Sequence, residues 1–190
     1  MKLGFGMMRL PRVEGTNDID LEHTKRMVDA FIEAGGKYFD TAYIYEGSEE
    51  ATKASLCDRY PRESYYLADK LNGSDFAAKS EEDAKNEIRV SLERTGAGYI
   101  DFYLLHGIDE GNIGNFNRYG IWEYMRKLKT EGLIRPASCA VSARQPVRNI
   151  CPSSACWQRS PIHWSNSAIL LFPSAPDFRA FLHKYYKKMM

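Results

Sequence analysis

The sequence predicts an α/β fold built on a parallel sheet, because two periodicities alternate along residues 1–135. Short apolar runs are typical of buried strands, and each is followed by a segment with apolar residues at helical spacing. The pattern recurs at roughly 30 residues, which is the length of one βαβ unit. We therefore expect four such units, with a fifth strand directly after Gly132.

The expected strands are the apolar runs at residues 3–8, 38–40, 64–68 and 99–105. The expected helices follow them and carry recognisable ends. Asp18 or Asp20 can cap the first helix, and Ser80 with Asp83 resembles a capping box before the third. Residues 48–50 open the second helix with acidic side chains, which the helix dipole favours there. The fourth helix spans 121–130, and Gly132 ends it.

The regular pattern stops after Arg135. Residues 136–168 show neither the strand period nor the helix period, and only 168–172 and 178–186 regain one. Structureless loops of that length are uncommon in compact domains. We therefore divide the chain into 1–135, which is regular, and 136–190, an irregular tail. A shifted reading frame or a truncation explains the tail better than a designed short fold.

Composition excludes several classes of function. The chain has 190 residues, with 26 Lys and Arg against 25 Asp and Glu, and a formal net charge of +1. A nucleic-acid binder would normally show a basic excess, so we expect no nucleic-acid partner. Charged residues interrupt every apolar run before the ~18 residues that a membrane span needs. The start of the chain lacks the apolar core of a secretory signal, which predicts a cytoplasmic protein.

The cysteines do not suggest a metal site. Cys151 and Cys156 enclose four residues, a spacing unlike the usual zinc or iron–sulfur pairs. Cys57 and Cys139 lie far from them in the sequence. In the cytosol all four would stay reduced. We interpret them as structural or incidental, and we expect neither a metal ion nor an iron–sulfur cluster.

Four polar residues stand out in the regular region. Asp40, Lys70 and His106 end three successive predicted strands, and Tyr45 lies in the loop after the first of them. The carboxyl ends of parallel strands share one edge of the sheet, where ligands bind. Each residue alone is ordinary, since a strand-end Lys is usually solvated and a lone Tyr usually packs. Their joint placement predicts a site.

At these residues the sequence resembles the aldo-keto reductase family. Residues 40–45 look like the family's Asp-Thr-Ala-x-x-Tyr signature, and 47–50 look like its Gly-x-Ser-Glu helix start. Residues 99–106 closely match its Tyr-Ile-Asp-x-x-x-x-His strand, and 67–70 resemble a strand that usually reads Ala-Thr-Lys. Segments 5–11 and 129–135 also fit, so the resemblance covers about residues 3–135.

The resemblance implies a (β/α)8 TIM-type barrel, of which this chain holds about four units, because a complete barrel needs about 250 residues. It implies NADPH or NADH as cofactor and a small carbonyl compound as substrate. Tyr45, Lys70, Asp40 and His106 would be catalytic. Gly6, Met7 and Met8 would bind the cofactor together with Asp40. The branch of the family that resembles this chain often carries a ferredoxin-like tail, but no such cysteine cluster is present here.

The residue types suit reduction of a carbonyl group. No side chain donates hydride, so a nicotinamide cofactor must supply it. A phenol such as Tyr45 is a weak acid, and an ammonium nearby, that of Lys70, would stabilise the phenolate. Asp40 would hold Lys70 charged and in place. His106 would orient the carbonyl oxygen by a hydrogen bond.

Three interpretations of function remain open. The first is a reductase, inactive if the missing barrel strands are essential. The second is a non-catalytic binding module on the same scaffold, although a pure binder has no need of an acid-activating Lys. The third is a half-barrel that associates with itself through its open sheet edges, where unpaired backbone groups invite another strand.

Overall fold

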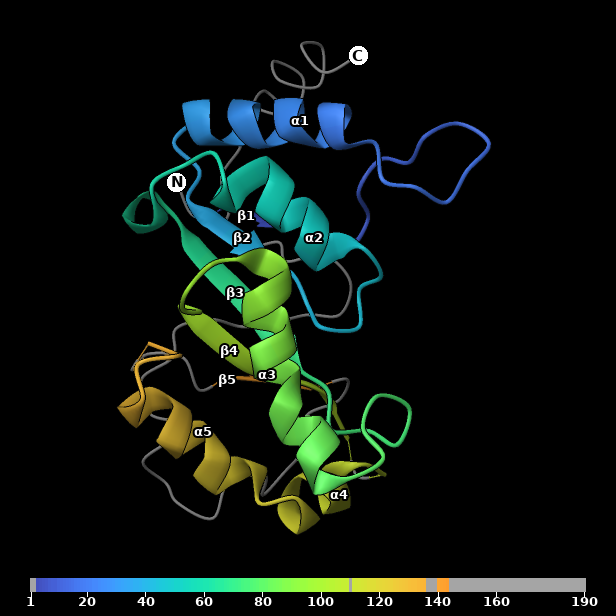
Figure 1. Ribbon diagram of the computed structural model, residues 1–190, viewed down its shortest axis with the longest axis vertical. Coiled ribbons are helices and arrows are strands. Elements are labelled where there is room, and N and C mark those ends of the chain that lie inside the picture. Colours follow the sequence, from blue (N-terminus) through green and yellow to red (C-terminus); the bar gives the residue numbers. More distant parts are fainter. Residues whose placement is uncertain (1–2, 110, 136–139, 144–190) are drawn as a thin grey trace, which may run out of the picture.

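The computed structural model describes residues 3–109, 111–135 and 140–143. They form one parallel sheet with the strands in sequence order (Figure 1). The strands are β1 (Gly4–Gly6), β2 (Tyr38–Asp40), β3 (Tyr66–Leu71), β4 (Phe102–Ile108) and β5 (Ala140–Ala143). Each strand pairs with the next along the chain. This arrangement confirms the predicted α/β class, and it is the order that one part of a (β/α)8 barrel would have.

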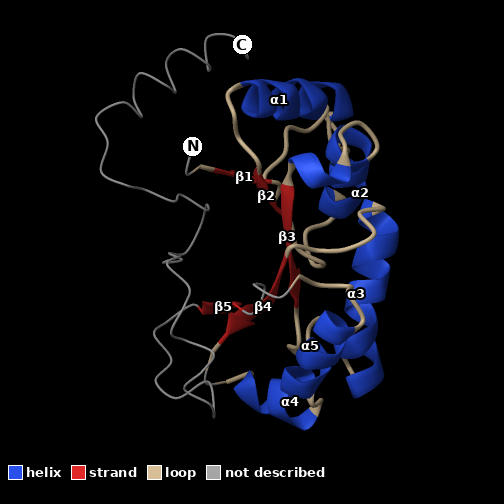
Figure 2. Cartoon of the chain, turned by 90° about the vertical axis from the view of Figure 1, so that its left-hand side faces the viewer, coloured by secondary structure: helices blue, strands red, loops and turns tan. Residues whose placement is uncertain are grey.

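The helices lie together on one side of the sheet (Figure 2). They are α1 (Leu21–Glu33), α2 (Ser48–Thr52), α3 (Glu81–Thr95), α4 (Ile113–Arg118) and α5 (Ile121–Thr130). A π-helical turn, Lys53–Cys57, continues α2, and a 3₁₀ turn, Arg62–Ser64, precedes β3. Among the described residues, no helix is long and apolar enough to span a bilayer.

The predicted helix starts are confirmed. The side chain of Asp20 accepts the N–H of His23 at 2.8 Å, so Asp20 rather than Asp18 caps α1. Ser80 Oγ accepts the N–H of Asp83 at 3.0 Å and caps α3. The carboxylate of Asp83 does not complete the reciprocal half of the box. It accepts the N–H of Lys79 instead, one residue before the cap.

Two strands begin later than the sequence pattern indicated. Residues 62–64 form the 3₁₀ turn, so β3 starts at Tyr66. The β4 strand starts at Phe102, because a side chain intervenes just before it. The carboxylate of Asp101 accepts the N–H of Leu67 at 2.9 Å, where a strand carbonyl would otherwise accept it.

Two elements differ from the sequence prediction. A fifth strand was expected directly after Gly132, whereas β5 begins at Ala140, within the segment 136–168 that shows no strand period, and it pairs in parallel with β4. The expectation that the regular fold stops at Arg135 is therefore wrong for 140–143. The helix α4 lies within 107–119, which was interpreted as a loop. The patterns at 168–172 and 178–186 fall outside the described residues.

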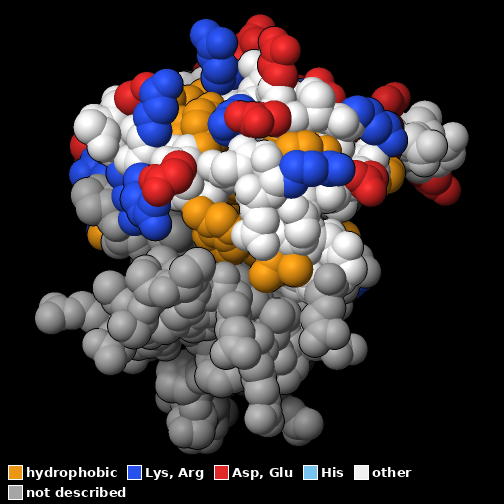
Figure 3. All heavy atoms as spheres, turned by 90° about the horizontal axis from the view of Figure 1, so that it is seen from below, with side chains coloured by type: hydrophobic (Ala, Val, Ile, Leu, Met, Phe, Trp, Pro, Cys, Tyr) orange, Lys and Arg blue, Asp and Glu red, His pale blue; other side chains and the backbone are white. Residues whose placement is uncertain are grey.

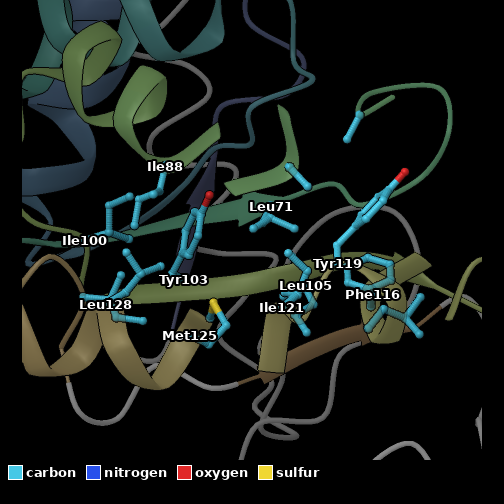
Figure 4. Packing of buried hydrophobic residues seen from close by; sticks show 14 residues of the cluster. Leu71, Ile88, Ile100, Tyr103, Leu105, Phe116, Tyr119, Ile121, Met125 and Leu128 are labelled. Carbon is cyan, nitrogen blue, oxygen red and sulfur yellow. The ribbon is translucent and has the colours of Figure 1, made fainter. Parts of the chain in front are cut away.

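Two apolar clusters fill the space between the sheet and the helices. One lies beneath α3, α4 and α5 and includes Tyr103, Leu105, Ile88, Met125 and Leu128 (Figure 4). The other lies beneath α1, where the rings of Phe5, Phe31 and Phe39 contact one another. These clusters fix the sheet from one side and leave the other face of the strands for the polar residues of the site.

Gly36 provides a test of the packing beneath α1. A Cβ atom at this position would lie 2.4 Å from two ring carbons of Phe31. Phe31 is buried among other rings and cannot move freely, so Gly36→Ala should lower the free energy of unfolding by about 1–3 kcal/mol. Chemical denaturation measures the change. The matched variant is Gly114→Ala, because nothing lies within 4 Å of the added methyl, and it should not destabilise the fold. Equal stability of both variants would contradict this packing.

Candidate active site

Three of the four residues singled out from the sequence, Asp40, Lys70 and His106, lie near the ends of neighbouring strands and share one face of the sheet, and Tyr45 lies in the loop after β2. Asp40 is in register with Ala68, two residues before Lys70. Lys70 is in register with Leu104, two residues before His106. Side chains two apart along a strand point to the same face. Asp40, Lys70 and His106 therefore project from the face opposite the helices. In register, Lys70 lies two residues beyond Asp40, and His106 lies two residues beyond Lys70.

A buried ion pair forms the centre of the site. Lys70 Nζ lies 2.5 Å from Asp40 Oδ1, and both side chains are only about one-twentieth exposed, at 6% and 5%. The same ammonium donates to the carbonyl oxygen of Thr41 at 2.7 Å. Burial raises the pKa of Asp40, while the charge and the hydrogen bond of Lys70 oppose that shift. Asp40 therefore depends on Lys70 to remain ionised away from water.

Tyr45 lies against this pair. Lys70 Nζ is 4.8 Å from the centre of the Tyr45 ring. The ring of His106 meets that of Tyr45 edge to face, with centroids 5.5 Å apart and an interplanar angle of 90°. A turn holds the tyrosine in place, since its N–H donates to Ala42 and its C=O accepts from Ser48. The structure thus brings together the four predicted catalytic residues.

The loop that carries Tyr45 is anchored by residues that sequence reasoning did not assign to the site. Ser48 Oγ donates to the carbonyl oxygen of Met7 at 2.9 Å and lies 2.7 Å from Thr41 Oγ1. These bonds join the end of β1 to the segment after β2. Thr41 belongs to the motif at 40–45 and Ser48 to the motif at 47–50. Their place in these motifs could have marked them as residues that hold the site together.

The predicted cofactor-binding residues after β1 differ in accessibility. Met7 is fully buried, and its N–H donates to Asp40 while its C=O accepts from Ser48. Gly6 is exposed, and the side chain of Met8 is 56% exposed. A ligand at this edge would therefore meet Gly6 and Met8 before Met7.

A second polar group lies behind the strands, on the face that packs against the helices. Asp69, Glu49 and Glu87 are each at most 1% exposed there, beside the hydroxyl of Tyr103. Glu87 Oε2 accepts the N–H of Asn72 at 2.6 Å. Burial is the main cause that raises the pKa of Glu87, to about 8, although that hydrogen bond opposes the shift. The signal for this group was an acidic residue, Asp69, directly before Lys70 in a strand whose other residues are apolar or aromatic.

Basic and acidic side chains are interspersed over the described part of the surface in Figure 3, in keeping with the balanced composition. No group of three or more His, Cys, Asp or Glu residues in the described part of the chain is arranged to hold a metal ion. Cys57 is a free thiol, and burial raises its pKa. The other three cysteines lie outside the described residues.

The profile of the Aldo/keto reductase family matches residues 2–155. The chain belongs to this family. It is 32% identical to an aldo-keto reductase of Mycobacterium sp. (strain MCS) over 122 residues, which are 64% of this chain and 41% of that protein. A relative from Mycolicibacterium smegmatis is 31% identical over the same shares of both chains.

Solved aldo-keto reductases share the fold. The holo form of an enzyme from Bacillus halodurans superposes with a TM-score of 0.60 and 30% identity, covering 76% of this chain and 47% of that one. A Bombyx mori aldo-keto reductase in complex with NADP gives a TM-score of 0.54 at 22% identity, covering 74% and 46%. This aldo-keto reductase chain therefore spans about two fifths of its curated relatives and matches part of a TIM-type barrel.

Glu87 predicts a pH dependence of stability. Its pKa is about 8 in the fold against an ordinary 4.5, so the folded chain holds this proton more tightly than the unfolded chain. The resulting stability is complete below pH 4.5 and is lost as pH rises through 8. Glu87→Gln, which keeps an oxygen for the Asn72 N–H, should be more stable by a few kcal/mol above pH 8. Thermal denaturation from pH 4 to 9 measures the difference, which should vanish at the acid end. A constant difference would contradict the shift.

Proposed function

We propose that this chain carries the catalytic half of an NAD(P)H-dependent aldo-keto reductase that reduces a small carbonyl compound to an alcohol. The observation that supports it most is the buried ammonium of Lys70, held by Asp40 and facing the ring of Tyr45. An ion pair that serves only stability does not require a half-exposed phenol beside it. A phenol that releases its proton at neutral pH does require a nearby cation, because the cation stabilises the phenolate.

The reaction adds a hydride and a proton, that is two electrons and two protons, to the carbonyl group. A bound nicotinamide supplies the hydride to carbon. Tyr45 donates its hydroxyl proton to the carbonyl oxygen as that oxygen gains charge. Lys70 stabilises the phenolate left behind, and Asp40 keeps Lys70 charged. The imidazole of His106, with its ring against that of Tyr45, orients the carbonyl oxygen by a hydrogen bond.

The residues present fit a nicotinamide cofactor. Asp40 Oδ2 is buried at the site and has no hydrogen-bond partner within the described residues. A carboxylate oxygen of this kind suits a hydroxyl donor such as that of a ribose. Gly6 leaves the adjacent backbone open, since no heavy atom lies within 4 Å of where a Cβ would stand. The Bombyx mori aldo-keto reductase described as a complex with NADP supports the same cofactor class.

Tyr45→Phe tests the proposal. Removal of the hydroxyl deletes the proton donor but keeps the ring contacts with Lys70 and His106. Turnover, followed as NADPH or NADH consumption with a simple aldehyde, should fall by at least about 100-fold. NADPH binding, followed by fluorescence titration, should stay within about twofold.

The control is Tyr66→Phe, because Tyr66 lies at the opposite end of β3 and is 52% exposed. It should leave turnover unchanged. A Tyr45→Phe variant that turns over at the rate of the unsubstituted chain contradicts the role of Tyr45. A chain that neither binds nor oxidises NADPH contradicts the proposal for this chain alone.

The open sheet supports a second candidate, association between copies. Among the described strands, β1 and β5 each pair on one side only. Unpaired strand edges bind other strands. We expect sedimentation equilibrium to give a concentration-dependent mass above that of the 21.8 kDa monomer. A single monomeric species at all concentrations contradicts this candidate and leaves the reductase proposal intact.

A further inference from the structure

We propose that Asp69 is a positioning residue that stays protonated at neutral pH. Its carboxyl group donates a hydrogen bond to Glu49 and so links β3, which carries Lys70, to the start of α2, which follows Tyr45. The positioning role rests on the proposed function, whereas the shared proton does not. The link lies on the helix face of the sheet, directly behind the ion pair of Lys70 and Asp40.

Asp69 and Glu49 approach each other from the two segments that carry the proposed acid and its ammonium. Asp69 immediately precedes Lys70 on β3, and its Oδ1 accepts the N–H of Lys70 at 2.7 Å. Glu49 follows Tyr45 by four residues, in the first turn of α2. Their carboxyl groups interact, since the contact with Glu49 raises the pKa of Asp69, and each group keeps one buried oxygen with no other hydrogen-bond partner among the described residues. This side-chain contact therefore connects β3 to the start of α2.

The two carboxyl groups need one proton between them. Asp69 Oδ2 and Glu49 Oε1 are both buried, and within the described chain neither has a partner other than the opposing carboxyl. Two ionised carboxylates in contact would repel and leave both oxygens unsatisfied, which is costly away from water. A single shared proton satisfies both oxygens and leaves one negative charge.

The surrounding charges assign that proton to Asp69. Glu49 Oε2 accepts from Arg94 Nη1 at 2.9 Å, so its negative charge is paired. Burial and the charge of Glu49 raise the pKa of Asp69 well above its ordinary value, while the N–H and the ammonium of Lys70 oppose the shift.

Two further groups face the pair from neighbouring elements. The carboxyl of Glu87 on α3 interacts electrostatically with Glu49, and the hydroxyl of Tyr103 on β4 interacts with both Asp69 and Glu49. Neither brings a positive charge. Arg94 is therefore the cation that compensates the pair on this face among the described residues, and it compensates Glu49.

Arg94 extends the link to the loop of Tyr45. Its guanidinium lies 5.0 Å from the centre of the Tyr43 ring, and Nη1 is 3.4 Å from the carbonyl oxygen of Tyr43. The N–H of Tyr43 in turn points to the carbonyl oxygen of Lys70 at 3.4 Å. The chain of contacts from Lys70 through Asp69, Glu49 and Arg94 thus returns to Lys70 through Tyr43. Such a ring fixes the spacing between the phenol and the ammonium.

Two substitutions separate the proton from the carboxylate. Asp69→Asn keeps an oxygen for the Lys70 N–H and supplies a permanent N–H donor to Glu49. Asp69→Leu has similar volume and removes both. Glu87→Gln is the matched control, because it removes a buried carboxyl on the same face without cutting the link.

The proton is tested first, without reference to activity. Infrared and carboxyl ¹³C spectra at pH 7 should show the protonated carboxyl groups of Asp69 and Glu87. Asp69→Asn should remove one of these signals, and Glu87→Gln should remove the other and leave that of Asp69. Asp69→Asn should also raise the melting temperature by an amount that grows with pH. A spectrum in which Asp69 is ionised at pH 7 overturns the inference, whatever the enzyme activity.

The positioning role is tested next. Asp69→Leu should shift the ring signals of Tyr45 and the side-chain signals of Lys70 in NMR spectra, whereas Asp69→Asn and Glu87→Gln should leave them in place. In turnover, Asp69→Leu should lower kcat by about 10- to 100-fold with little change in KM. Asp69→Asn should restore it and flatten the alkaline limb of the pH profile. Unmoved Tyr45 and Lys70 signals in Asp69→Leu overturn the positioning role. An active Tyr45→Phe with a protonated Asp69 overturns only the proposed function.

Discussion

The contact between Lys70 and Asp40 is the interaction on which the site depends. Each partner would be costly to bury alone, and removing one leaves an uncompensated charge away from water. The pair also fixes a geometry, because the ammonium is bonded to the carboxylate and to the carbonyl oxygen of Thr41. Only one side of the ammonium then remains for Tyr45. The placement of the proposed acid follows from how the pair is held.

Successive side chains of β3 point to opposite faces of the sheet, so this strand contributes to two different environments. Lys70 points to the face opposite the helices, where the buried ion pair lies, and Asp69 points to the helices, where Glu49 lies. Each face therefore has a buried carboxylate whose charge must be compensated. On one face the ammonium of Lys70 compensates Asp40, and on the other a proton on Asp69 avoids repulsion with Glu49. Both contacts hold the same short stretch of β3 backbone.

Much of this arrangement could be predicted from the sequence, because its causes are local. Asp20 and Ser80 cap helices through bonds to residues three positions on, and Gly132 ends α5 as expected. The convergence of Asp40, Lys70 and His106 followed from the geometry of parallel strands. The position of β5 was not predicted, since its residues have no alternating pattern and the strand is defined by its pairing with β4. The link between Asp69 and Glu49 was missed for the same reason: it depends on a contact between segments twenty residues apart.

The order of the strands has a consequence for how the chain acquires its structure. Each strand pairs with the one made just before it, from β1 to β5. No pairing has to wait for a distant segment, so the entropy lost in closing each loop is small. A chain emerging from the ribosome can therefore add one strand and one covering helix at a time, from the N-terminus onward. Lys70 and Asp40 meet as soon as the third strand is in place, before the residues of β4 are needed.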